Sequence, residues 1–214
     1  MKINVIIPSC KQYAELRMLV SCIRRFDTGT DKITYFPTGF DTSAAVNRNF
    51  GMMLSSVEVD KPDYIIMIDD DIGGFFEGWQ QKLIEPLLSL PEARLSAARL
   101  MTPEGTFSAM MGSKGDVSEP LEKVYPAVLS AVIAFRTTDV VGKIWFDNLY
   151  VGSGFEDTDF CYQLLEHYPN AEFVINNDCR LIHYHEMKNQ SPNHEVNKGY
   201  FVQKWGRNLR GLVI

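Results

Sequence analysis

Apolar runs alternate with amphipathic stretches through residues 1–90 of the chain. The apolar runs, which are typical of buried strands, span residues 3–7, 33–36 and 64–68. Apolar residues recur at helical spacing over 13–25, over a segment that begins at an Asp41/Thr42 cap, and over 78–90. Because strands and helices alternate here, we expect a parallel sheet with right-handed crossovers.

The second half of the chain has a less regular pattern. Strands are predicted over 94–101, 128–135 and 173–175, and helices over 156–167 and 198–205. We see no linker rich in Pro, Gly or Ser that would divide the chain. We therefore predict a single α/β domain over residues 1–214, built on a mixed central sheet that helices flank.

The composition is that of an ordinary folded domain, with 45% hydrophobic and 22% charged residues. A net charge of −6 argues against bulk electrostatic binding of nucleic acid or anionic lipid. The apolar start is too short for a signal peptide, and no apolar stretch approaches the ~20 residues that span a bilayer. The four cysteines form no CxxC pair, so we expect reduced thiols and a cytoplasmic location.

Three carboxylates, Asp69, Asp70 and Asp71, directly follow the predicted strand 64–68. Open α/β sheets place their ligands at the carboxyl ends of such strands. In extended backbone Asp69 and Asp71 project to one side, so that two oxygens can face a hard cation. Adjacent negative charges also favour a counter-ion. The triplet is consistent both with a divalent metal site and with a polar loop that caps the next helix.

A second acidic cluster, with Glu156, Asp157 and Asp159, follows a glycine-containing loop at the start of a predicted helix. The helix dipole stabilises an acid in the first turn by ~0.3–1 kcal/mol, which would explain one of them. Three acids are more than a cap needs. We interpret Asp157 or Glu156 as a candidate general base that deprotonates an alcohol acceptor.

Histidine and arginine supply two further candidates. His183 and His185 would share one side of an extended segment, where an imidazole can complete a metal site begun by Asp71, although histidines at strand ends are often structural. Arg48 and Asn49 lie on the second predicted helix, with Arg48 roughly opposite a face formed by Phe50, Met53, Leu54 and Val57. The guanidinium could meet a diphosphate or could lie on a solvated helix face.

The order of these features along the chain is more informative than any one of them. An apolar strand ending in Pro8-Ser9, the Arg48-Asn49 helix, the Asp triplet, a GSGFEDTDF segment, a strand ending in histidine and a Lys-Trp-Gly run follow in turn. This order resembles the GT-A-fold glycosyltransferases, and most closely glycosyltransferase family 2, over about residues 2–206. The resemblance implies a Rossmann-like mixed sheet, with a nucleotide-sugar half of about 1–105 and an acceptor half of about 106–214.

The resemblance further implies a metal-dependent, inverting hexosyl- or pentosyltransferase that moves a sugar from a nucleoside-diphosphate sugar, a UDP-sugar in the first instance, to an acceptor hydroxyl. The implied donor-binding residues are Pro8, Ser9, Arg48, Asn49, Asp69 and Asp70. Mn²⁺ or Mg²⁺ would be held by Asp71 and His183, with His185 as the fallback. Asp157 would be the base beside Glu156, and the implied acceptor-binding residues are Gly154, Phe155 and Asp159.

Departures from the family pattern leave the ligands open. Asp41 is the only acid between 35 and 41, where an acid usually reads the base, and Gln163 replaces a common arginine. Residues 110–124 match no motif. The acceptor could be a saccharide, a lipid-linked glycan, a protein or a modified nucleobase. An inactive nucleotide-sugar- or glycan-binding relative is the alternative, although a pure binder need not retain both acidic pairs.

Overall fold

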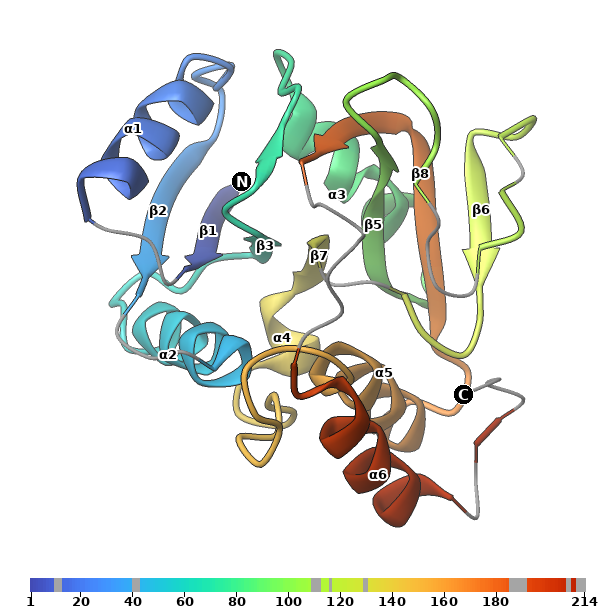
Figure 1. Cartoon of the computed structure of the whole chain (residues 1–214). Helices are drawn as coiled ribbons and strands as arrows, with labels where there is room; N and C mark the ends of the chain where they lie inside the picture. The colour runs from blue at the N-terminus through green and yellow to red at the C-terminus, as the bar shows by residue number, and fades with distance from the viewer. Residues whose placement is uncertain are drawn as a thin grey trace.

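A mixed central sheet forms the body of the protein in this computed structural model, which describes residues 1–9, 13–39, 43–108, 113–115, 117–128, 131–184, 192–206 and 209–210. Within these residues the strand order is β2-β1-β3-β7-β5-β8-β4, with β6 also paired to β8 (Figure 1). The strands are β1 Lys2–Pro8, β2 Lys32–Thr38, β3 Tyr64–Ile68, β4 Ile72–Gly73, β5 Ala93–Met101, β6 Leu121–Val124, β7 Val132–Arg136 and β8 Glu172–His183. The helices are α1 Tyr13–Arg24, α2 Ala44–Ser56, α3 Trp79–Ser89, α4 Thr137–Val140, α5 Glu156–His167 and α6 His194–Trp205.

Strand direction brings the predicted site residues to one edge of the sheet. β1 pairs in parallel with β2 and β3, as the alternation of strands and helices predicted. β7 runs antiparallel to both β3 and β5, while β8 is parallel to β5. The carboxyl ends of β1, β2 and β3 therefore meet the start of β7, where the Asp69 N–H donates to the Ala131 carbonyl at 2.8 Å. This edge is where open α/β sheets bind ligands.

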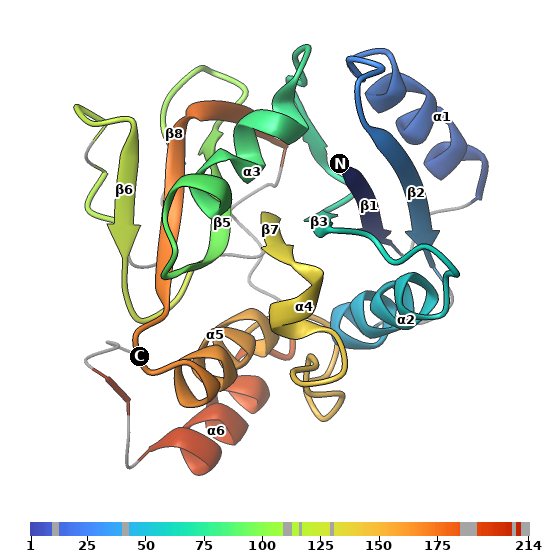
Figure 2. The same cartoon turned by 180° about the vertical axis from the view of Figure 1, so that it is seen from behind.

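Helices cover the sheet and close one end of the molecule. α2 packs on β1, and α3 packs on β5 and β8. α5 and α6 lie side by side below the sheet in both views (Figures 1 and 2). α5 joins the main core through Phe160, whose ring stacks on Phe146 at 4.3 Å and tilts against Phe135 of β7. α6 adds a second apolar cluster, in which Trp205 and Phe201 pack on Tyr162 of α5.

The α2 helix buries a different face from the one that the large apolar residues suggest. Met53 and Val57 are 45% and 72% exposed, whereas Arg48 and Gly51 face inward. Small residues decide this packing, because a Cβ on Gly51 would lie only 2.4 Å from Cγ2 of Ile6 in β1. The cap also differs: the Ser43 hydroxyl accepts from the Val46 N–H, and the predicted cap residues 41 and 42 lie outside the described residues.

Two short strands were missed by the sequence analysis, and one was predicted too short. β4 and β6 both pair with β8, which extends over twelve residues rather than the three that were predicted. β6 falls within 110–124, for which the sequence indicated no element. Of the described helices, none is both long and apolar enough to cross a membrane.

Candidate functional site

The two acidic clusters meet at a single buried arginine. Arg48 of α2 donates from one guanidinium nitrogen to Oε1 of Glu156 at 2.7 Å and from the other to Oδ1 of Asp69 at 3.0 Å. Its side chain is only 4% exposed and lies over the Phe146 ring at 5.2 Å. The end of β3 and the start of α5, far apart in the sequence, therefore form one site.

Charge and burial oppose one another around Arg48. Burial lowers the pKa of the Arg48 guanidinium, but the negative charges of Asp69 and Glu156 outweigh that effect and raise it above its usual range. Burial raises the pKa of Glu156, Asp157 raises it further, and Arg48 compensates only in part. Desolvation likewise raises the pKa of Asp69, which keeps 32% of its side-chain surface exposed. The single positive charge of Arg48 thus faces the negative charges of several carboxylates, so the site retains net negative charge and favours a cation.

Asp71 and His183 are brought together by the pairing of β4 with β8. Ile72 lies opposite His183 in the register, and the Tyr184 N–H donates to the Asp71 carbonyl at 2.9 Å. The Asp71 carboxylate then lies 3.3 Å from Nε2 of His183, and both side chains are partly exposed. Burial lowers the pKa of His183, but the hydrogen bond with Asp71 and the charges of Asp71 and Asp69 together raise it.

This pair fits a divalent cation whose remaining ligands come from a substrate. A carboxylate oxygen and an imidazole nitrogen are suitable ligands for Mn²⁺, and such metals are often bound by one or two protein groups plus substrate phosphates. Over the part of the chain that the structure describes, no group of three or more His, Cys, Asp or Glu side chains could hold a metal by itself. The fallback ligand, His185, lies outside the described residues.

The end of β1 adjoins the Asp triplet. Pro8 and Ser9 are buried, and the Ser9 N–H donates to the Thr38 carbonyl at the end of β2 at 2.9 Å. The Ser9 hydroxyl donates to the Asp70 carboxylate. Asp70 therefore faces β1, on the side where the donor-binding residues were predicted.

Asn49 and Asp159 have roles that differ from the predicted ones. The Asn49 amide binds the Phe146 backbone, donating to its carbonyl at 2.6 Å and accepting from its N–H at 2.9 Å, so it holds a loop rather than facing a donor. Asp159 has no exposed surface. Its carboxylate accepts hydrogen bonds from Tyr150, Gln163 and Trp205 and forms an ion pair with Lys204. This corrects the prediction that Asp159 binds an acceptor hydroxyl.

The proposed base and its neighbours form the entry to α5. Asp157 is half-buried, and its Oδ1 accepts from the Thr158 N–H at 2.7 Å. Gly154 and Phe155 precede it in left-handed backbone, with φ of 107° and 70°. The sequence analysis missed the residues of α6 that support this entry. In the sequence, Lys204 and Trp205 were noted only as part of the Lys-Trp-Gly run, and Asn197 carried no signal.

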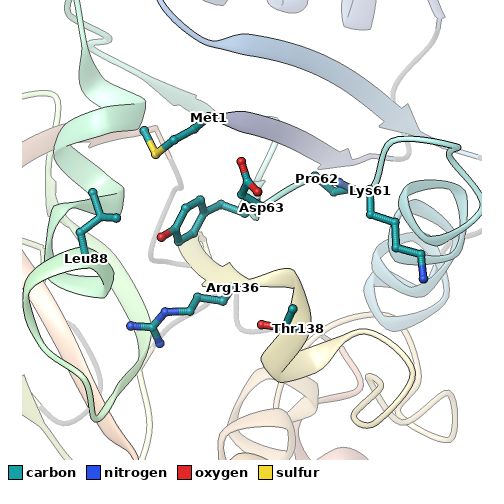
Figure 3. Close-up of a pocket in the computed structure, with 8 residues that line it drawn as sticks. Met1, Lys61, Pro62, Asp63, Leu88, Arg136 and Thr138 are labelled. Carbon is teal, nitrogen blue, oxygen red and sulfur yellow. The ribbon is translucent and has the colours of Figure 1, made fainter.

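A separate pocket of about 510 Å³ opens at the opposite ends of β1 and β3 (Figure 3). Its lining includes Met1, Asp63 and Arg136. These groups have partners in the fold: Asp63 accepts from the Lys2 N–H at 2.8 Å, and Arg136 donates to the Ala93 carbonyl at 2.8 Å. The pocket is remote from the acidic edge, so it plays no part in the site.

Comparison with known proteins identifies the fold. No protein-family model matches the sequence, and no curated protein is significantly similar to it. The structure of GalNAc-T7 with UDP, GalNAc and Mn²⁺ superposes with a TM-score of 0.70 over 98% of this chain, at 11% identity. This chain spans 49% of the GalNAc-T7 chain, about half of its length.

A substituted form of Drosophila β1,4-galactosyltransferase 7, solved with manganese, UDP-Gal and xylobiose, matches more distantly. Its TM-score is 0.55 over 92% of this chain and 79% of that chain, at 15% identity. Both structures share the mixed central sheet with flanking helices. The chain therefore has a GT-A-type glycosyltransferase fold, which confirms the predicted fold class.

Proposed function

We propose that this chain is a metal-dependent glycosyltransferase that transfers a sugar from a UDP-sugar to an acceptor hydroxyl. The observation that carries the proposal is the convergence of Asp69, Arg48 and Glu156 with the Asp71–His183 pair at the carboxyl edge of a GT-A-type sheet. Two structural neighbours, solved with manganese and a uridine nucleotide, support the choice of donor and cation. The order of the sequence motifs favours family 2 within this fold.

The donor side of the mechanism uses the ends of β1, β3 and β8. Asp71 and His183 would hold Mn²⁺ or Mg²⁺, which supplies positive charge to the diphosphate as it leaves. Ser9, Asp69 and Asp70 would face the nucleoside side of the donor. Arg48 would not contact the diphosphate as the resemblance implied, because its guanidinium is buried and paired with carboxylates. It would instead hold Asp69 and Glu156 in place.

The acceptor side uses the start of α5. Glu156 is buried and paired with Arg48, which leaves Asp157 as the carboxylate that can reach an acceptor. Asp157 accepts the proton of the acceptor hydroxyl while that oxygen bonds to the anomeric carbon. The bond between this carbon and the diphosphate oxygen breaks with its electron pair on the diphosphate. Attack from the opposite face inverts the anomeric configuration.

The first test is a thermal-shift panel of UDP-sugars, other nucleotide-sugars and nucleoside diphosphates, each with Mn²⁺ and with EDTA. A ligand at ~100 times its Kd stabilises the folded state by about 2.7 kcal/mol. For a chain of this size that raises Tm by roughly 5–11 °C. We expect a shift with uridine nucleotides that EDTA abolishes. A shift with another base would correct the donor, and none with any nucleotide would refute the proposal.

The second test measures turnover without knowledge of the acceptor. Water can serve as the acceptor hydroxyl, and NMR of the sugar released from an α-linked donor then reports which anomer forms first. The β-anomer is expected from inversion, whereas the α-anomer would refute the single displacement. Metal-dependent binding without any release of UDP, with saccharide, peptide or lipid-linked acceptors also supplied, would instead indicate a nucleotide-sugar-binding protein.

A further inference from the structure

A buried asparagine of α6 holds the loop that leads into the candidate base. Asn197 is 1% exposed, and its side chain contacts the backbone of residues 151–154. Its Oδ1 accepts from the Val151 N–H at 3.0 Å. Its Nδ2 lies 3.0 Å from the carbonyls of Val151 and Gly154 and 3.3 Å from that of Ser153. This one side chain thus bonds to the loop at three carbonyls and one N–H, and α2 adds one bond from the Ala44 N–H to the Gly152 carbonyl at 2.8 Å.

The loop needs such support because its own conformation is poorly determined by local preference. Gly152 and Gly154 both have positive φ, and glycine has the largest conformational freedom to lose on folding. Phe155 also has a positive φ of 70°, which a residue with a Cβ adopts only when its surroundings impose it. Those surroundings are again α6, since the Phe155 ring packs on His194 and Phe201 at 5.2 and 5.4 Å.

The conformation of this loop determines where the two acids of α5 point. The Gly154 N–H donates to Oε2 of Glu156, and the Phe155 carbonyl accepts the Asp159 N–H at 2.8 Å in the first turn. A rotation at Gly154 or Phe155 would therefore turn the carboxylates of both Glu156 and Asp157. The Asp71–His183 pair is held by β4 and β8 and does not depend on this loop.

We infer that Asn197 is a positioning residue for the proposed transfer, acting through the loop 151–154 on the direction of the Asp157 carboxylate. The inference rests on the proposed function and deepens it. It assigns to α6 a role on the acceptor side, whereas Asp71 and His183 are held by β4 and β8. Loss of Asn197 should therefore reduce kcat while the affinity for UDP with Mn²⁺ is retained.

The experiment compares Asn197→Ala with a matched control, Asn176→Ala. Asn176 is also 1% exposed and also bonds to backbone, through the Lys82 carbonyl at 2.8 Å and the Asp178 N–H at 2.9 Å, but it lies in β8 away from the base. Both substitutions should lower Tm by similar amounts. Only Asn197→Ala should reduce kcat for UDP release, by about 100-fold if the carboxylate moves by 1 Å, with UDP and Mn²⁺ titrations unchanged.

A second variant, Asn197→Asp, keeps the shape of the side chain and the acceptor for the Val151 N–H. It replaces the amide donor with a carboxylate that faces three carbonyls, so kcat should fall as in Asn197→Ala. Equal kcat in the Asn197 and Asn176 variants, or an equal loss of UDP affinity and kcat in the Asn197 variants, would overturn the positioning role. A wild-type protein that binds no UDP-sugar with Mn²⁺ and releases no UDP would overturn the proposed function, and this inference with it.

Discussion

Replacing Arg48 with methionine tests the central ion-pair network. Methionine fills much of the space of the arginine stem but removes the guanidinium that joins Asp69 to Glu156. Breaking a buried pair from one side costs about 3–5 kcal/mol, because the remaining charge is left without its partner. Glu156, which is 4% exposed, bears most of this cost, whereas Asp69 at 32% exposure keeps contact with water. For a chain of this size the loss should lower Tm by roughly 6–20 °C at neutral pH.

The dependence of this loss on pH identifies its cause. Burial and Asp157 already raise the pKa of Glu156 in the folded protein, and removal of Arg48 should raise it further. A carboxyl group with a raised native pKa opposes folding above that pKa, and the penalty disappears as the pH falls below the unfolded value. The destabilisation by Arg48→Met should therefore be larger at pH 8 than at pH 5. Urea denaturation at the two pH values measures it.

Two further variants complete the test. Adding Glu156→Gln to Arg48→Met removes the stranded charge and should restore part of the lost stability at pH 8. Arg25→Met, at an exposed position, controls for the loss of a positive charge and should change the free energy of unfolding little. A destabilisation by Arg48→Met that is the same at pH 5 and pH 8 would refute the reasoning. So would a loss no larger than that of Arg25→Met.

Three other predictions concern the base, the metal and the packing of α2. Asp157→Asn should retain the thermal shift with UDP and Mn²⁺ yet lose turnover by about 10²–10⁴-fold, and normal turnover would remove Asp157 as the base. His183→Ala should weaken the apparent Mn²⁺ affinity by at least about 10-fold in a titration of the UDP-dependent shift, and an unchanged titration would remove His183 from the metal site. Gly51→Ala should destabilise by about 1–3 kcal/mol through its clash with Ile6, despite the better helix propensity of alanine. Gly199→Ala in α6, where a Cβ meets nothing within 4 Å, should stabilise instead, and urea denaturation of both variants separates packing from propensity.

Local pattern was sufficient for the elements that are buried on both faces. β3 is a continuous apolar run and β1 is apolar apart from Lys2 and Asn4, and their strand character and parallel pairing were predicted. β4 has two residues and exists because Ile72 and Gly73 pair with the end of β8. No periodicity can be read from two residues, so the strand pattern did not predict this pairing. The contact between Asp71 and His183 was a hypothesis from their residue types and from the family resemblance.

The face of α2 illustrates why Arg48 was ambiguous. Hydrophobic periodicity weights large residues, which here include Met53 and Val57, both exposed. Close approach of the helix to β1 instead requires small residues, and Gly51 meets that need. Arg48 lies on this inward face and can be buried there because Asp69 and Glu156 neutralise it. A prediction from residue size alone therefore misplaces Arg48, Met53 and Val57, although the large residue Met52 is buried on the inward face.

Residue type indicated a candidate chemistry for the site but not the partners of each side chain, and sequence separation explains the difference. The clustering of Glu156, Asp157 and Asp159 is visible in four consecutive positions, so their acidity could be interpreted directly. Arg48 bonds to Glu156, which lies 108 residues away in the sequence, and Asp159 bonds to Trp205, which lies 46 residues away. Such pairings arise only when the sheet brings α2, α5 and α6 to one edge. Neighbouring acids in the sequence consequently differ in their surroundings. Asp159 is fully buried and bonded to other side chains of the fold, whereas Asp157, two residues earlier on the same helix, is partly exposed and accessible to a substrate.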